Sequence, residues 1–320
     1  MAIQYGIEFE MQNITGNEVW NAVESAEPAS GHIDRRVYGW HSSAAPSPGR
    51  DNGGRDGRWF AMRDGSLSGP GCTENGKGNV ELVSSILYGE AGDREMLRVL
   101  TRLNAAGATV DQSCGTHITV GLNNNARWNR LSVAGKVKVG NRIVEFYNHF
   151  QAVFDAMSPN CRQVNGFSAF TMRAPELMTE SRNQGTRYSA VNLSNYILYG
   201  ASAGGRIEFR QPGYTLSAKK IMLWLKIIRC IISMALNENH RSRNYELTEM
   251  PQTVTGMATY LGLGAALEAR LRARIEELYR NHRSNRASRA LVLSSDVFCI
   301  SCEDQIHNPL SGQNLCAECE

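Results

Sequence analysis

The sequence predicts an α+β protein built on a mostly antiparallel sheet, and two observations lead to this fold class. Short runs that alternate apolar and polar residues, typical of half-buried strands, recur through the first 240 residues. Among them lie segments whose apolar residues recur three and four positions apart, which is typical of helices. Strands and helices interleave with short turns, and this order favours an α+β architecture.

The first expected strand covers residues 3–11, whose odd positions are apolar. Because side chains alternate along a strand, Glu8 and Glu10 share the opposite face. The same alternation marks the other expected strands, at residues 59–62, 80–83, 114–122, 188–193 and 206–210.

Helical spacing of apolar residues predicts helices at residues 93–106, 131–157, 218–237 and 257–283. The third contains a densely apolar run, Ile221–Leu236, which has the charged residues Lys226 and Arg229 within its 16 positions. A membrane span needs about 20 apolar residues and excludes central charges, so this segment is a buried core helix. Residues 41–57 are rich in Gly, Pro and Ser and predict a long loop.

Composition sets the broad class of the protein. With 42% hydrophobic and 20% charged residues, the chain has the composition of a soluble globular protein. Its net charge of +3 is too small to indicate a nucleic-acid partner by itself. The N-terminus lacks a charged region followed by an apolar core, so no signal peptide is expected. Four cysteines are scattered without framework spacing, which favours a reducing compartment and a cytoplasmic location.

The last 25 residues carry a C-x2-C-x13-C-x2-C pattern, formed by Cys299, Cys302, Cys316 and Cys319. Each C-x2-C pair can present two thiolates to one tetrahedral ion. The pattern predicts a structural Zn2+ site in a small zinc-ribbon-like module at residues 296–320. Four thiolates leave no open coordination position, so this ion would hold structure and take no part in chemistry.

The segment before the zinc module is basic. Residues 241–295 are expected to form a helical extension and linker between a main domain at residues 1–240 and the cysteines. Five arginines of this segment recur near glutamates at helical spacing, and we favour a solvated face laced with salt bridges. The alternative is a basic surface for nucleic acid or another acidic polymer.

Carboxylates recur on the expected strands. Glu8 and Glu10 share a strand face, and Glu81 and Glu208 lie on other strands. If these strands belong to one sheet, the carboxylates meet on one surface, where their repulsion implies a bound cation. Oxygen ligands suit Mg2+ or Mn2+. Arg210 lies on the face of Glu208, and a mixture of metal and guanidinium suits phosphoryl transfer.

Taken alone, each of these residues is typical of an ordinary solvated strand or a core histidine, but their order resembles a known family. The motifs are GIEFE (6–10), W-x4-DGSL (59–67), ELVSSIL (81–87), CGTHITVGL (114–122), RYSAVNL (187–193) and RIEFRQPGYTLSAKKIMLW (206–224). Together they resemble the amidoligase family, carboxylate–amine ligases of the glutamine-synthetase-like superfamily. The resemblance covers roughly residues 1–240.

The resemblance implies a twisted antiparallel sheet of the glutamine-synthetase-like type, whose concave face binds Mg-ATP. It assigns the metal ligands to Glu8, Glu10, Glu81 and Glu208. It assigns phosphate binding to Arg210 and Arg187, with Asn192 as a polar contact. It also places Asp64 near the substrate amine or the nucleotide. His117 matches the first histidine of the family's C-G-x-H-x-H strand, and Thr119 replaces the second.

The reaction that the resemblance implies is ATP-dependent formation of an amide bond through an acyl phosphate. The catalytic residues would be Asp64, His117 and Arg210, with Asp64 or a glutamate outside the metal shell as the base that deprotonates the amine. The partners would be a carboxylate substrate and an amine substrate, either of which could be part of a peptide or protein. No membrane partner is expected. Two alternatives stay open: a guanidino-kinase-like phosphotransferase on the same fold, and a binding module made of the zinc ribbon and the Arg-rich helix.

Overall fold

The structure is a computed structural model that describes residues 3–26, 33–38, 58–65, 67, 69–159, 189–193, 196, 205–281 and 292–293. Arg187, the loop expected at residues 41–57 and the four cysteines of the expected zinc module lie outside these residues. What the sequence predicts for them stays a prediction, as do the domain boundaries.

One sheet runs through the described part of the chain, in the strand order β2-β3-β4-β1-β6-β8-β7, with β5 also paired to β1. The neighbouring strands are antiparallel except for the parallel pair β2–β3, which confirms the α+β class with an antiparallel sheet. The strands are β1 (Gln4–Ile14), β2 (Ile33–Tyr38), β3 (Trp59–Met62), β4 (Gly78–Val83), β5 (Leu87–Tyr88), β6 (Thr116–Gly121), β7 (Val191–Asn192) and β8 (Arg206–Phe209).

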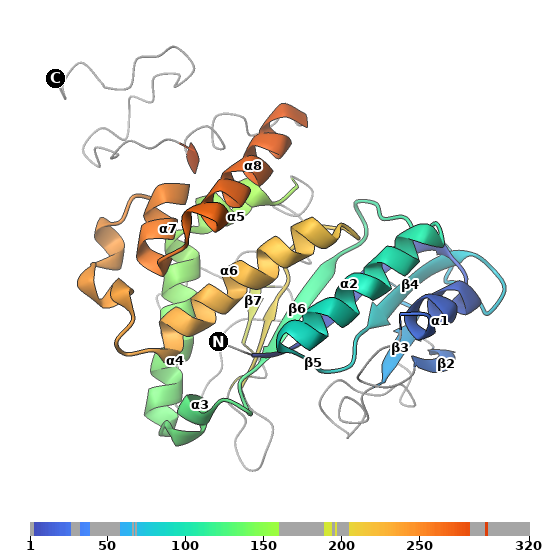
Figure 1. The fold of residues 1–320 in the computed structure, drawn as a ribbon, viewed down its shortest axis with the longest axis horizontal. Coiled ribbons are helices and arrows are strands. Elements are labelled where there is room, and N and C mark those ends of the chain that lie inside the picture. The colour runs from blue at the N-terminus through green and yellow to red at the C-terminus, as the bar shows by residue number, and fades with distance from the viewer. Residues whose placement is uncertain are drawn as a thin grey trace.

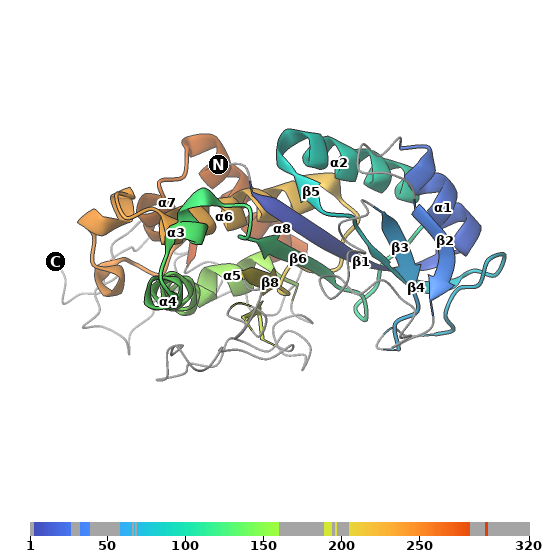
Figure 2. The same cartoon turned by 90° about the horizontal axis from the view of Figure 1, so that it is seen from below.

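Helices cover one face of the sheet and extend beyond one edge (Figure 1). Figure 2 shows α1 and α2 lying along that face. The α-helices are α1 (Gly16–Glu24), α2 (Gly89–Ala105), α3 (Ala126–Arg130), α4 (Val133–His149), α5 (Gln151–Met157), α6 (Ala218–Leu236), α7 (Val254–Leu261) and α8 (Ala265–Asn281), with short 3-10 turns η3 (Arg241–Asn244) and η4 (Leu247–Glu249). Within the described residues, none of the helices combines the length and the apolar character that crossing a bilayer requires.

Two expected helices are each divided into a pair. The segment expected at residues 131–157 breaks at Phe150, whose backbone leaves the helical region at φ −95° and ψ 20°. The basic helix expected at residues 257–283 begins earlier and breaks at Gly262, which takes the left-handed conformation at φ 67°. Glycine adopts this conformation without a steric cost, so α7 ends there and α8 starts a new direction.

Helix α1 was not expected from apolar spacing, although its start carries a local signal. The Thr15 hydroxyl accepts a hydrogen bond from the backbone N–H of Glu18, and the Glu18 carboxylate accepts one from the backbone N–H of Thr15, at 3.1 and 2.8 Å. This reciprocal capping box satisfies two backbone donors at the start of the helix. The helix packs against α2 and β2 and covers one end of the sheet.

The hydrophobic core lies between the sheet and helices α2, α4, α5, α6 and α7, and it encloses one ionic network. Asp93 of α2 accepts hydrogen bonds from the Tyr5 hydroxyl at 2.9 Å and from both terminal nitrogens of Arg229 at 2.8 and 2.6 Å. Nearby, the indole of Trp59 donates to Glu95 at 2.7 Å. These contacts fasten β1 and β3 to the helices behind them.

The Arg-rich helix α8 packs against α5 and α6, and three of its arginines pair with glutamates of the same helix. Arg272 lies 3.1 Å from Glu268, and Arg274 lies 2.9 Å from Glu277. Lys220 of α6 also contacts Glu277, at 3.1 Å. These pairs are the ones expected for a face laced with salt bridges.

Candidate active site

Four strands present acidic or imidazole side chains on the face of the sheet that lies opposite the core. The apolar residues of β1 at odd positions are buried, so Glu8 and Glu10 point to the other face. On the neighbouring strands, Glu10 pairs with Glu81 of β4, and Glu8 pairs with His117 of β6. Glu208 of β8 lies one strand beyond β6. The sheet pairing therefore gathers residues that are far apart in sequence.

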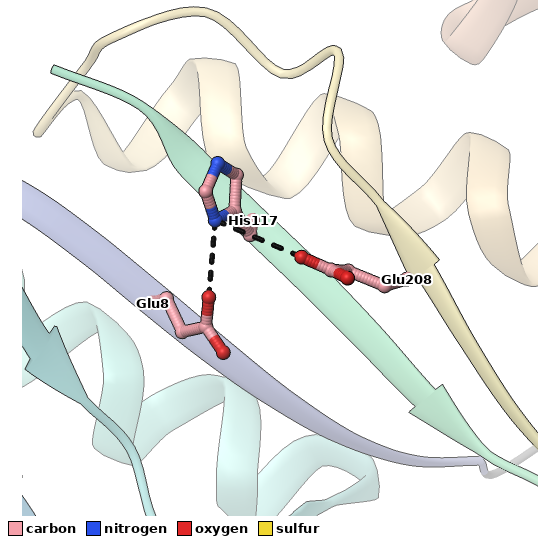
Figure 3. A group of neighbouring side chains, drawn as sticks. All are labelled: Glu8, His117 and Glu208. Atoms are coloured by element: carbon pink, nitrogen blue, oxygen red, sulfur yellow. Dashed lines mark hydrogen bonds and ion pairs between the residues drawn. The ribbon is translucent and has the colours of Figure 1, made fainter. Parts of the chain in front are cut away.

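The first cluster consists of Glu8, His117 and Glu208 (Figure 3). Nδ1 of the imidazole lies 3.0 Å from Oε2 of Glu8 and 3.8 Å from Oε1 of Glu208. One potential ligand atom from each residue lies within 4.8 Å of the other two. Both carboxylates therefore face the same imidazole nitrogen, and the three side chains can converge on one ion.

The second cluster consists of Glu10, Asp64 and Glu81, whose potential ligand atoms also lie within 4.8 Å of one another. Asp64 reaches it from the turn that follows β3, and the two glutamates face each other across β1 and β4. Nε2 of His117 lies 3.8 Å from Oε1 of Glu10. The imidazole of the first cluster therefore also lies beside the second cluster, and the two clusters adjoin on the sheet face.

Two polar side chains orient the carboxylate of Glu208. The guanidinium of Arg210 donates to Oε1 and forms an ion pair with it. The side-chain amide of Asn192 donates to Oε2 at 2.8 Å. Because both oxygens are engaged, the carboxylate is held in one orientation, with Oε1 facing both the imidazole and Arg210.

The electrostatics of the face oppose ionisation of its carboxyls. Burial raises the pKa of Glu81 well above its ordinary value, and the negative charges of Glu8, Glu10 and Asp64 raise it further. Burial also raises the pKa of Glu8, although Arg210 acts in the opposite direction. A cation bound among these groups would reverse this effect, because it favours the charged carboxylates.

The chemistry of the two clusters fits hard divalent cations. Five of the six side chains offer carboxylate oxygens and the sixth offers an imidazole nitrogen. Carboxylate oxygens suit Mg2+ and Mn2+, and an imidazole nitrogen is tolerated better by Mn2+. The crowding of carboxyls on one face, of which Glu10 is buried and the others are half-buried, is the observation that favours a cation over an ordinary polar surface.

The structure thus brings together most of the site residues expected from the sequence. Glu8, Glu10, Glu81 and Glu208 do share one face, and Arg210 and Asn192 contact Glu208 there. The grouping of two further residues was missed. Asp64 was expected near the substrate amine or the nucleotide and His117 as a catalytic residue, and both lie among the carboxylates. The strand pairing of Glu8 with His117 places the imidazole among the carboxylates, and a single sequence contains no signal for that pairing.

Residues 2–134 match the sequence profile of a protein family described as "Putative amidoligase enzyme". This segment contains five of the six clustered side chains, and Glu208 lies beyond it. Among solved structures, a chain described as "Crystal structure of novel glutamine synthase homolog" matches with 14% identity and a TM-score of 0.37. The match covers 87% of this chain and only 65% of that homolog, and likeness at this level does not establish a shared fold. No curated protein matches the chain.

Proposed function

We propose that the chain is an ATP-dependent carboxylate–amine ligase that forms an amide bond through an acyl phosphate. The observation that carries the proposal is the pair of adjoining ligand clusters on one face of the sheet, flanked by a guanidinium. The family profile that matches residues 2–134 supports this choice of reaction among those that use metal and phosphate. The glutamine-synthetase-like type of the sheet is part of the proposal.

In this proposal two divalent cations, Mg2+ or Mn2+, are held by the two clusters. Glu8, His117 and Glu208 would bind one of them, and Glu10, Asp64 and Glu81 the other. Bound there, the ions would neutralise the negative charge of the ATP phosphates. His117 and Asp64 accordingly change from the catalytic roles expected of them to ligand roles. With Asp64 bound, a carboxylate outside the two ions' shells would accept the proton of the amine.

The reaction has two steps. A carboxylate oxygen of the first substrate attacks the γ-phosphorus of ATP, the bond to the bridging oxygen breaks, and ADP leaves. The nitrogen of the second substrate then attacks the acyl carbon, inorganic phosphate leaves with its bonding electrons, and the amine proton passes to a base. Phosphorylation is needed because a free carboxylate is a poor electrophile at neutral pH.

The side chains of this chain contribute positioning and charge. Arg210 would donate to phosphoryl oxygens as charge spreads over them, and Glu208 and Asn192 would fix its orientation. Arg187 is proposed as a second phosphate-binding group. Such preorganised donors act without reorganising during the reaction. The four cysteines at residues 299–319 are proposed to bind a structural Zn2+ that holds a module for a larger substrate or partner.

The test is ATP turnover with mixtures of candidate carboxylates and amines. We expect ADP release that needs both a divalent cation and an amine, and a product whose mass equals both substrates less one water. The variant Glu10→Gln should lose this turnover. The matched control is Glu90→Gln, which removes the same charge from an exposed position on α2.

Two outcomes would contradict the proposal. ADP release without an amine, with a stable phosphorylated acceptor, would identify a phosphotransferase. Absence of turnover together with oligonucleotide binding that weakens steeply with salt would identify a binding module.

A further inference from the structure

The second residue after β8, Gln211, is held inside the core by three hydrogen bonds. Gln211 is fully buried. Its side-chain oxygen accepts from the hydroxyl of Tyr147 on α4, and its amide nitrogen donates to Oδ1 of Asp155 on α5 at 2.7 Å. Its backbone carbonyl accepts from the hydroxyl of Ser158 at 3.2 Å. Two helices and the turn after them therefore hold this one residue.

Gln211 and Arg210 are neighbours in sequence and point to opposite sides of the sheet. The side chain of Phe209 is buried, so odd-numbered residues of this segment face the core, and Gln211 is one of them. Arg210 faces the site, where it pairs with Glu208, while its backbone N–H donates to the carbonyl of Ala190 at 2.8 Å. Glu208 lies within β8 and is paired with strands on both sides, whereas Arg210 lies after its end, so a displacement of Gln211 would move Arg210 relative to Glu208.

We infer that Gln211, held by Tyr147 and Asp155, is a positioning residue that sets the guanidinium of Arg210 against Glu208 and the phosphates of ATP. The functional part rests on the role proposed above for Arg210. The side chain of Gln211 lies behind the sheet and would not touch substrate. Its effect is transmitted by the backbone, because the two residues share one planar peptide unit, so a displacement of Gln211 shifts Arg210.

An exchange of partners tests this directly. Gln211→Glu replaces the amide that donates to Asp155 at 2.7 Å by a second acidic group, so the two carboxyls face each other in the core. In the double variant Gln211→Glu with Asp155→Asn, the new amide donates to the new carboxylate, and Tyr147 keeps its acceptor. Asp155→Asn alone keeps an acceptor for Gln211 and should behave like the parent.

Two readouts separate positioning from stability. The first is the NMR signal of the Arg210 Nε–H group, assigned by its loss in Arg210→Lys, which reports the guanidinium without any turnover. The second is the division between kcat and KM for MgATP. We expect Gln211→Glu to shift the signal and to lower kcat by up to about tenfold with little change in KM, since misplacing the guanidinium should cost no more than losing its forked geometry in Arg210→Lys. The double variant should restore both.

Controls keep the test decisive if Gln211→Glu fails to fold. Asp155→Ala leaves Gln211 intact, removes its acceptor and should shift the same signal. Tyr147→Phe removes the hydroxyl that donates to Gln211 and should shift the Arg210 signal. Tyr196→Phe removes another buried hydroxyl, which donates to the carbonyl of Lys136 on α4, and should leave the signal unchanged.

An unmoved signal in Gln211→Glu and Asp155→Ala, or a double variant that does not restore it, would overturn the inference. A signal that moves and returns as expected while ATP turnover stays constant would support the positioning and overturn the role proposed for Arg210. The two failures are therefore distinguishable.

Discussion

Ionisable groups lie on both sides of strand β1, and their negative charge is balanced differently on the two sides. The carboxylate on the core side is paired with an arginine, whereas the carboxyls on the site side are crowded together. On the core side, Tyr5 reaches Asp93, whose two oxygens are both bonded to Arg229. The hydrogen bond to Asp93 raises the pKa of Arg229 and so stabilises the charged guanidinium. On the site side, the pKa of Glu81 is raised by burial and by neighbouring carboxyls.

The difference separates structure from function within one sheet. The core-side carboxylate is neutralised by a cation that the chain itself supplies, as a stable interior requires. The site side gathers negative charge that an external cation would neutralise. Folding alone gives no reason to accumulate such charge, and ligand binding does. Four measurements test this difference between the two sides of the strand.

The largest effect is expected on the core side. Arg229→Met leaves the carboxylate of Asp93 buried without its ion-pair partner, which should lower the free energy of unfolding by about 3–5 kcal/mol. Urea denaturation measures this loss. The control is Arg94→Met, whose exposed pair with Glu90 should contribute less than about 1 kcal/mol. Equal losses in both variants would show that the buried pair of Arg229 and Asp93 stabilises the fold no more than the exposed pair of Arg94 and Glu90 does.

On the site side, Glu81→Gln should separate stability from activity. We expect metal-dependent ATP turnover to fall about 100-fold, because the substitution removes a proposed cation ligand. The metal-free protein should at the same time become more stable, since one of several repelling charges is gone. Thermal unfolding without metal and steady-state kinetics with Mg2+ measure the two effects. A less stable variant with parental turnover would place Glu81 among the structural residues.

Arg210→Lys should have a smaller effect, about tenfold in kcat/KM. A lysine keeps the positive charge and loses the forked geometry of the guanidinium, and one hydrogen bond to a charged group contributes about 1.5 kcal/mol. Kinetics that match the parent would make Arg210 a sheet-surface partner of Glu208 alone.

The smallest effect is the pH dependence of stability in the metal-free protein. The pKa values of Glu8 and Glu81 are raised on folding, mainly by burial. Between the ordinary carboxyl pKa, about 4.3, and the raised values, the folded chain holds more protons than the unfolded chain. The free energy of unfolding therefore falls as pH rises through this window, by at most about 1.4 kcal/mol per pH unit for each group.

The difference in melting temperature between the parent and Glu81→Gln, measured from pH 4 to pH 8, isolates the contribution of one glutamate. We expect the variant's advantage to widen as pH rises, because only the parent loses stability when Glu81 ionises. Saturating Mg2+ should flatten the difference, because the cation favours the ionised carboxylates. A gap that narrows as pH rises without metal would show that folding lowers the pKa of Glu81 instead of raising it.

Local patterns of the sequence were enough to predict the elements that carry the site. The alternation along residues 3–11 predicts both β1 and the shared face of Glu8 and Glu10, because it is set by neighbouring residues. The break at Gly262 was missed, because a single glycine within a helical pattern is compatible with a continuous helix. Its left-handed conformation is seen only in the structure. The start of α1 could have been found from the capping-box spacing of Thr15 and Glu18.

The arrangement of the site depends on contacts between distant residues, and that is why it was predicted in part. The sequence indicates that Glu208 and His117 lie on strands, but the neighbouring positions of β6, β1 and β8 result from packing of the whole sheet. The register that places Glu8 opposite His117 is likewise non-local. For this reason the imidazole could be identified as a site residue and not as a member of a carboxylate cluster.

The two clusters become complete at different times during synthesis of the chain. The cluster of Glu10, Asp64 and Glu81 has its last member at residue 81, whereas the other cluster needs Glu208, 127 residues later. At about 5–20 residues per second, this separation corresponds to about 6–25 seconds of translation. Throughout that interval the nascent chain contains every residue of the first cluster and only part of the second. The cluster of Glu8, His117 and Glu208 forms only after β8 has been added beside β6. Because β8 is the last strand along the described chain, this cluster is completed together with the sheet.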